Sequence, residues 1–317
     1  MNKSNLTTID FIEESYNALD LYNLKIEKLP KLLDPFLQKV GLASLVGTSD
    51  AGKSTLLRQL SLAIAFKHKT FLKFDLDISS GKVLYISTED DPTSIAHSIR
   101  RQIESISKEY KSLDKSLLKN IEFIFDPHNL LEKLTKKMLN KQYDLIIIDA
   151  FADVFNKEIN ANTQVRQFLN GFDKLAKQHN SLILFLHHIG KKTMSYDPSK
   201  NSIIGSQAFE AKMRSVLELR PNLSSNSLKD LWVLKSNFLE SKYKTKSYIL
   251  NFDNLIFTYT GNRGTTQSAK ISNPTIIKKV MELHKKKLSY RDIATKLKGT
   301  QYAIGKTAIG KIIKSTK

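Results

Sequence analysis

Residues 42–57 read LASLVGTSDAGKSTLL, and this stretch decides the fold of the 317-residue chain. It opens with an apolar run typical of a buried strand, and apolar residues at helical spacing follow from Leu56 onward. The residues between them fit the phosphate-binding pattern G-x-x-x-x-G-K-[ST], the P-loop. A strand, a loop and a helix in this order predict a nucleotide site at Gly47, Thr48, Ser49, Asp50, Ala51, Gly52, Lys53, Ser54 and Thr55.

The residue types of this loop indicate the chemistry of each position. Gly47 and Gly52 allow backbone conformations that turn N–H groups toward a phosphate, and the following helix adds the positive end of its dipole. Lys53 is expected to reach the β- and γ-phosphates, and Ser54 to hold Mg2+. We therefore predict ATP and Mg2+ as ligands, and the alternative is a Gly- and Ser-rich turn that matches by chance.

Two further strands of the expected sheet end in acids. Residues 82–88 form a strand pattern closed by Glu89, and residues 143–149 contain four consecutive aliphatic residues closed by Asp149. So continuous a run fits a central parallel strand that is buried on both faces. Because ligands of open α/β sheets bind at the carboxyl ends of strands, both acids are expected near phosphate and metal. We predict that Asp149 contacts Ser54 or a magnesium-bound water, the role called Walker B.

A pair of histidines follows the buried strand expected at residues 181–186. His187 and His188 are open to three interpretations: metal ligands, core or surface histidines, or a sensor of the γ-phosphate. Neighbouring strand residues face opposite sides of a sheet and no third ligand is evident, which disfavours a metal site. We favour the sensor, and His188 over His187 because it is the terminal one.

The rest of the pattern predicts an α/β fold with a mainly parallel central sheet and antiparallel edge hairpins. Helices are expected at residues 54–66, 92–108, 129–139, 163–178 and 205–214, the last with Ser206 as its cap. Strands are expected at residues 42–46, 82–88, 121–125, 143–149, 181–186 and 215–220, and edge strands at 231–236, 247–251 and 255–259. A small hairpin from residue 71 is expected to turn at Ser79-Ser80-Gly81, with loops at 151–162 and 191–204.

Composition changes at the C-terminal end of this pattern. We divide the chain into a lead-in of residues 1–40 with a helix near 10–19, an α/β domain of 41–262, a polar linker of 263–274 and an all-α domain of 275–317. The last domain is expected to hold helices at 275–286, at 290–297 after a Ser289 cap, and at 306–314. Inward positions of the last helix are Ala308, Ile309, Ile312 and Ile313, and outward positions are Lys306, Thr307, Lys311 and Lys314. Three short helices with a basic last face predict a helix-turn-helix module, and the alternative is a bundle for protein contacts.

The charge of the chain points to a polyanionic partner. The formal net charge is +19, and residues 265–317 carry thirteen Lys or Arg against Glu282 and Asp292. A lysine-rich composition on a solvated surface is the alternative explanation. The absence of cysteine excludes disulfides, thiolate metal sites and cysteine nucleophiles. No secretory signal or run of about 20 apolar residues is evident, so we expect a soluble, cytoplasmic protein without membrane contact.

Further motifs narrow the class of P-loop enzyme. Glu89 ends the strand after the P-loop helix and no acid follows Asp149, which resembles RecA-type ATPases and differs from the AAA+ type. Further motifs are Phe185-Leu186-His187-His188 with a following lysine, Gly205-Ser206 leading to Arg214, and Val233-Leu234-Lys235-Ser236-Asn237. With these, residues 32–259 resemble the plasmid and mobile-element RepA branch of the DnaB-related hexameric replicative helicases. The basic tail is not part of that pattern, and its turn at 298–305 is longer than in common helix-turn-helix modules.

The resemblance implies a role for each matching residue. Glu89 would polarise the attacking water, and His188 would sense the γ-phosphate. Arg214 would enter the neighbouring subunit's site as an arginine finger, with Lys235 assisting in trans. DnaB-like relatives have an arginine two positions after that lysine, where this chain has Asn237, so the finger role is given to Arg214.

These features lead to a hypothesis of function with two alternatives. We expect a DNA-stimulated ATPase that assembles as a homo-oligomer, a hexamer by resemblance, and moves on or unwinds DNA of a mobile element. Loops after Asp149 and at residues 191–204 would hold single-stranded DNA in a central channel, and the basic tail would bind duplex. The alternatives are a nucleotide-gated DNA-binding regulator and a partner-remodelling ATPase without a DNA substrate.

Overall fold

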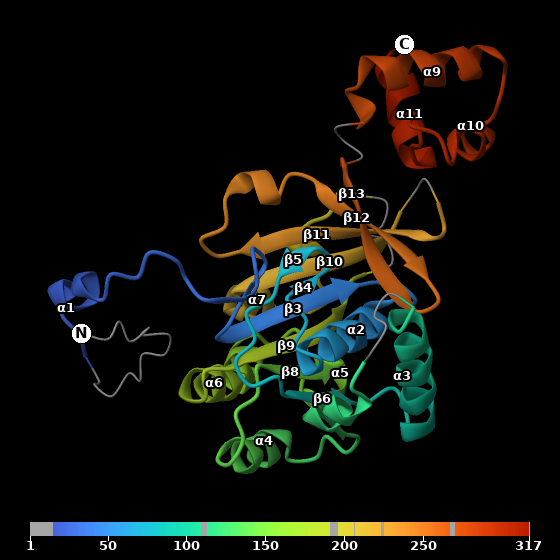
Figure 1. The fold of residues 1–317 in the computed structure, drawn as a ribbon. Coiled ribbons are helices and arrows are strands. Elements are labelled where there is room, and N and C mark those ends of the chain that lie inside the picture. Colours follow the sequence, from blue (N-terminus) through green and yellow to red (C-terminus); the bar gives the residue numbers. More distant parts are fainter. Residues whose placement is uncertain are drawn as a thin grey trace.

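A large twisted sheet forms the centre of the molecule (Figure 1). The computed structural model describes residues 15–108, 113–190, 196–205, 207–222, 225–266 and 270–316. Within these ranges nine strands form one sheet in the order β13-β12-β11-β10-β3-β9-β8-β6-β7. Their bounds are β3 Gly41–Gly47, β6 Val83–Ser87, β7 Ile121–Ile124, β8 Leu145–Asp149, β9 Leu182–His188, β10 Ser215–Pro221, β11 Leu228–Ser236, β12 Ser247–Asp253 and β13 Ile256–Gly264.

The sheet has a parallel part and an antiparallel part. From β7 to β10 every neighbouring pair is parallel, whereas β10, β11, β12 and β13 pair antiparallel. The P-loop strand β3 lies between β9 and β10, so β9 separates it from β8, the strand that ends in Asp149. The predicted α/β class is therefore confirmed: the chain has a RecA-like P-loop core with antiparallel edge hairpins.

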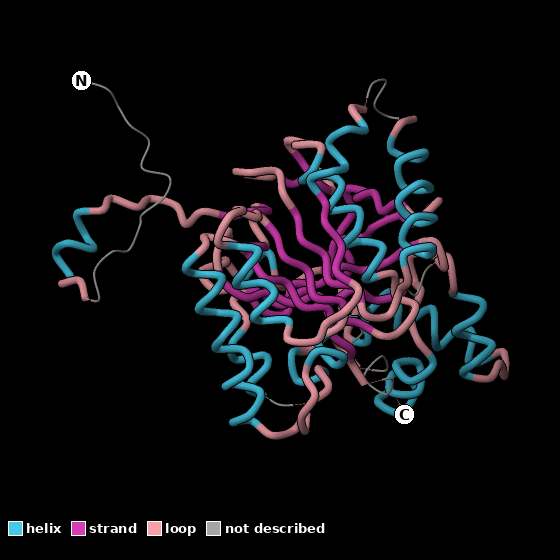
Figure 2. Tube along the Cα trace, turned by 90° about the horizontal axis from the view of Figure 1, so that it is seen from below, coloured by secondary structure: helices cyan, strands magenta, loops and turns pink. Residues whose placement is uncertain are grey.

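Helices cover both faces of the sheet (Figure 2). The apolar residues of α2 (Lys53–Ala65) pack on one face, where Ala43 and Leu45 of β3 point. The other face, which receives Leu42 and Val46, is covered by α4 (Leu130–Met138), α5 (Phe151–Val154), α6 (Asn162–Gln178) and α7 (Gln207–Lys212). Helix α3 (Pro92–Ile106) packs against α2. Strands between two layers of helices must be apolar on both sides, which explains their continuous aliphatic runs.

Several elements differ from those expected from the sequence. The N-terminal helix α1 is Ala18–Asn23, capped by Asn17; residues 10–14 of the helix expected near 10–19 lie outside the described residues, and residues 15–17 are not helical. The expected loop at residues 151–162 begins with α5, because Phe151 is fully buried among other rings. Residues 263 and 264, expected in the linker, complete β13. Residues 191–195 of the expected loop, and the expected cap Ser206, also lie outside the described residues.

The small hairpin turns at a different place. Its strands are β4 (Thr70–Phe71) and β5 (Phe74–Asp75), and Leu72 and Lys73, both at positive φ, form the turn. The expected turn residues instead surround the buried Asp144 carboxylate. It accepts hydrogen bonds from the N–H groups of Ser79, Ser80 and Gly81 and from the Ser80 hydroxyl. This contact fixes the chain where it enters β6.

The C-terminal helices have a hydrophobic core of their own. They are α9 (Pro274–Lys285), α10 (Tyr290–Leu297) and α11 (Lys306–Ser315), and the Ser289 hydroxyl accepts from the Asp292 N–H as the expected cap. The four expected inward residues of α11 are buried and the four outward ones are exposed. The remaining short elements are β1 Lys31–Leu33, β2 Leu37–Gln38, η1 Lys115–Asn120, η3 Lys200–Ser202 and η4 Ser241–Tyr243. In the described part of the chain, no helix combines the length and the apolar character that crossing a bilayer requires.

Replacing Asp144 by alanine tests the contact that positions β6. Loss of a buried charged acceptor leaves several donors without a partner, so we expect the free energy of unfolding to fall by about 2–3 kcal/mol in chemical denaturation. The control is Glu104→Ala, which removes an exposed ion pair with Arg101 on α3 and is expected to cost less than about 0.5 kcal/mol. Equal losses in the two variants would contradict this role of Asp144.

Candidate nucleotide site

The P-loop connects β3 to α2 and is packed tightly from two sides. A Cβ at Gly47 would lie 2.5 Å from the carbonyl oxygen of Leu219 on β10. Gly52 has a φ of +93°, and a Cβ there would lie 2.8 Å from the Phe257 ring of β13. Both positions therefore require glycine, and the antiparallel hairpin contributes directly to the shape of the loop.

Lys53 lies in this loop with its ammonium group surrounded by acceptors. Its side chain is buried, and its Nζ donates a hydrogen bond to the Thr48 carbonyl oxygen at 2.8 Å. Burial lowers the pKa of the Lys53 ammonium, while the carboxylates of Asp149, Glu89 and Asp50 act in the opposite direction. These carboxylates are thus near enough to stabilise the cation.

Asp149, at the end of β8, is a buried carboxylate with one hydrogen-bonded oxygen. The Tyr85 hydroxyl donates to its Oδ2 at 2.6 Å. Burial raises the pKa of the Asp149 carboxyl, and hydrogen bonds from Tyr85 and Ser54 lower it. Its Oδ1 is buried without a partner among the described residues. An unpartnered carboxylate oxygen on a residue that also interacts with Ser54 fits a site for Mg2+, which prefers oxygen ligands.

Glu89 and the two histidines complete this end of the sheet. Glu89 Oε1 lies 3.5 Å from His188 Nε2, and both side chains are partly exposed. His187 is fully buried on the opposite face, where its ring nitrogen Nε2 lies 2.8 Å from the Ile204 carbonyl oxygen. Burial lowers the pKa of His187 to about 4, so it is neutral at pH 7. The structure thus brings together Lys53, Ser54, Glu89, Asp149 and His188, and makes His187 a core histidine.

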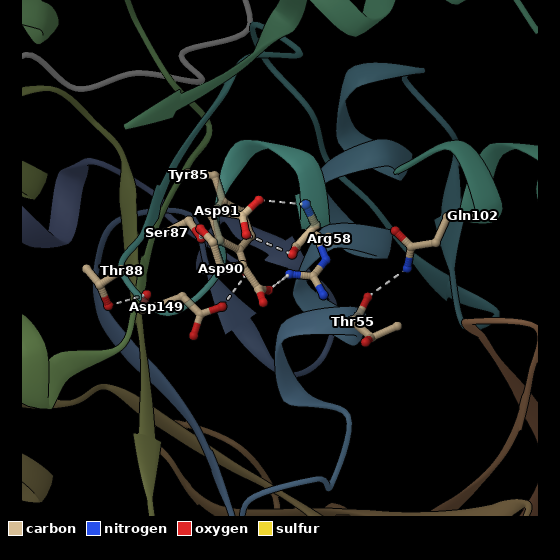
Figure 3. Close-up of polar contacts among 10 residues, drawn as sticks. Thr55, Arg58, Tyr85, Ser87, Thr88, Asp90, Asp91, Gln102 and Asp149 are labelled. Atoms are coloured by element: carbon tan, nitrogen blue, oxygen red, sulfur yellow. Dashed lines mark hydrogen bonds and ion pairs between the residues drawn. The ribbon is translucent and has the colours of Figure 1, made fainter. Parts of the chain in front are cut away.

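A polar network behind these residues is not evident from the sequence (Figure 3). Arg58 of α2 donates to Asp90 at 2.8 Å, beside Glu89, and is itself nearly buried. The Thr88 hydroxyl donates to the Asp149 carbonyl oxygen at 2.8 Å and accepts from the Ala150 N–H at 3.0 Å. The bonds of Thr88 and Tyr85 join β6 to the end of β8, and Arg58 joins α2 to the segment after β6. An arginine within the apolar pattern of α2, and a tyrosine within the apolar run of β6, are the only sequence signals of this network.

Arg214 lies at the other end of the sheet from the P-loop. Its side chain packs over Gly41, the first residue of β3, at 3.1 Å from the position of a Cβ there. The seven residues of β3 span about 20 Å at about 3.3 Å per residue, more than an arginine side chain can reach. Among the described residues, the Arg214 guanidinium has no hydrogen bond or ion pair. The structure therefore does not bring Arg214 to the P-loop of its own chain.

Lys235, expected to act in trans, has partners within its own chain. Its Nζ donates to the carbonyl oxygens of Glu210 at 2.9 Å and Ala211 at 3.2 Å, and lies 3.1 Å from the Glu210 carboxylate. These carbonyl groups belong to the last turn of α7, where a cation is favourable. Lys235 thus ties α7 to β11 next to Arg214.

The fold and this cluster of residues define a P-loop ATPase domain. Comparison with known families is more specific: residues 14–194 match the family described as AAA domain (AAA_25), and the chain belongs to that family. The matched range contains the P-loop, Glu89, Asp149 and His188, and it ends before Arg214.

A solved structure supports the assignment of the fold. The chain is similar to a structure described as an ATPase domain, with a TM-score of 0.52 and 12% sequence identity over 76% of this chain and 95% of that one. No curated protein matches the chain. The chain therefore has the RecA-like core that the sequence predicted. Its family is nevertheless described as an AAA domain.

Replacing Tyr85 by phenylalanine tests the support of Asp149. The Tyr85 hydroxyl lowers the pKa of the Asp149 carboxyl, so its loss should raise that pKa further. The carboxylate is then protonated at a higher pH. As the pH is lowered, we expect the variant to lose Mg2+-dependent binding of a fluorescent ATP analogue at a higher pH than the wild type does. Tyr143→Phe is the matched control, because the Tyr143 hydroxyl donates to Glu122 on β7. Identical pH profiles for both variants would contradict this role of Tyr85.

Proposed function

We propose that the chain is an ATP-dependent, DNA-stimulated motor of the replicative helicase or translocase type, belonging to a plasmid or mobile element. The observation that carries this proposal is the separation of the site residues. Glu89, Asp149 and His188 gather at the P-loop end of the sheet, whereas the guanidinium of Arg214 lies about 20 Å away at the other end. An ATP site built in this way is complete only where two subunits meet.

In each subunit, the P-loop end of the sheet would bind ATP. The backbone N–H groups of the loop and Lys53 would hold the phosphates, and Ser54 and Asp149 would hold Mg2+. Bound Mg2+ would neutralise charge on the phosphate oxygens. Glu89 would orient and polarise the attacking water, and His188, 3.5 Å from Glu89, would respond to the γ-phosphate.

The neighbouring subunit would supply Arg214. A guanidinium without a polar partner among the described residues is available to neutralise the charge that develops on the transferred phosphoryl group. The reach of the side chain excludes this role within one chain, so hydrolysis would require assembly. The resemblance to hexameric helicases makes a six-membered ring the expected form.

Two features support DNA as the partner. Helices α9 to α11 carry many exposed lysines around their small core, which suits a polyanion. The segment that follows β9 is connected to the nucleotide end: the Ile204 N–H donates to the His188 carbonyl oxygen at 3.2 Å, and the Arg220 guanidinium donates to the Tyr196 carbonyl oxygen at 2.8 Å. A change at His188 would therefore reach the loop that we expect to contact single-stranded DNA.

Mixing two inactive variants tests the shared site. Glu89→Gln should bind ATP but lose about 10²–10⁴-fold in turnover, and Arg214→Ala about 10³-fold or more. In a mixture, some interfaces combine an intact Glu89 with an intact Arg214, so we expect DNA-stimulated hydrolysis to reappear. Mixing Glu89→Gln with Lys53→Ala is the control, because both variants are defective on the same side of the interface. Normal hydrolysis by Arg214→Ala alone, or no recovery in the first mixture, would refute the shared site.

The basic face of α11 gives a second prediction. Replacing Lys306, Lys311 and Lys314 by glutamine should weaken duplex binding and reduce the slope of log K against log salt by about 2–3, measured by fluorescence anisotropy. The control replaces three exposed lysines of the ATPase domain, Lys136, Lys174 and Lys177, and should leave the slope unchanged. Equal slopes for both triple variants would remove α11 from the DNA-binding surface.

A further inference from the structure

Phe238 is an exposed aromatic residue in an unfavourable backbone conformation. It lies two residues beyond the end of β11, 79% of its surface is exposed, and its φ is +61°. Residues with a Cβ rarely adopt this left-handed region, and a bulky aromatic has no polar side chain to compensate. Within its own chain, Phe238 therefore combines backbone strain with exposed apolar surface.

Four other residues at positive φ have a local reason for it. Leu72 and Lys73, and likewise Asn254 and Leu255, are the central residues of two-residue hairpin turns. Phe238 instead lies in the longer connection between β11 and β12. Asn237 and Phe238 form a turn at the start of this connection, and an aromatic residue at positive φ in a turn is uncommon. Strained positions of this kind cluster at functional sites.

Neighbouring contacts hold Phe238 beside Arg214. The Asn237 N–H donates to the Arg214 carbonyl oxygen at 3.0 Å, which extends the β10–β11 ladder past the pair Ser215 and Ser236. On the other side, Leu239 is buried in the main core. Because the residues before and after it are fixed, Phe238 faces outward at the same end of the sheet as Arg214.

We infer that Phe238 is an aromatic anchor of the subunit interface, packing against a second copy of this chain in the contact that carries Arg214 into the neighbouring ATP site. The inference rests on the proposed shared site. A buried aromatic surrounded by polar residues is a common centre of binding energy in protein interfaces, and Asn237 and Glu240 beside Phe238 are exposed and polar. Arg214 would then act in hydrolysis and Phe238 would add binding energy to the interface, both from the same end of the β10–β11 pair.

The test uses a substitution that should relieve strain while removing the anchor. Asparagine tolerates the left-handed region, so Phe238→Asn should keep or raise the melting temperature of the full chain at low protein concentration. In sedimentation velocity with a non-hydrolysable ATP analogue and Mg2+, we expect the concentration for assembly to rise at least tenfold. Phe238→Tyr keeps the ring and should assemble like the wild type.

Two outcomes would overturn the inference. The first is assembly of Phe238→Asn at the wild-type concentration; if this variant also binds single-stranded DNA more weakly, Phe238 is a DNA contact instead. The second is an equal loss of assembly in Phe238→Tyr. If either of these occurs while Glu89→Gln and Arg214→Ala still complement each other, the shared site stands and only the anchor fails.

Discussion

The common direction of β3, β9, β8 and β6 is the constraint on which the rest of the structure depends. Parallel strands place all their carboxyl ends at one edge, and in this chain those ends carry the P-loop, Glu89, Asp149 and His188. The same constraint puts the beginning of β10, and with it Arg214, at the opposite edge. The strand directions thus gather the P-loop, Glu89, Asp149 and His188 at one edge and separate them from Arg214, which we propose acts in the site of a second chain.

Burial then determines how the assembled groups behave. The Tyr85 hydroxyl compensates for burying the Asp149 carboxylate, because its hydrogen bond offsets part of the desolvation cost. Arg58 pairs with the partly exposed Asp90, and Thr88 bonds to the Asp149 carbonyl oxygen. The described residues leave Asp149 Oδ1 without such compensation, and this is the atom that a metal ion would satisfy. The side chains that would bind Mg2+ are therefore held in place by contacts within the chain.

Features that depend on local pattern could be predicted from the sequence. The P-loop, the aliphatic run before Asp149 and the helical spacing of α11 each identify their element without any distant contact. The turn expected at Ser79-Ser80-Gly81 was wrong because the partner of those residues, Asp144, is more than 60 residues away. Likewise, no local pattern reveals that Arg58 reaches Asp90 or that Lys235 bonds to α7, because packing between elements decides both.

We propose that two chains form each working ATP site. Measuring how the rate of ATP hydrolysis per chain changes as the protein is diluted tests this most directly. The rate per chain should be measured with single-stranded DNA across a dilution series, with particle mass determined at each concentration. We predict that the rate per chain falls toward zero as oligomers dissociate and that it follows the fraction of chains in oligomers. A rate per chain that stays constant down to concentrations where every particle is a monomer would contradict the account.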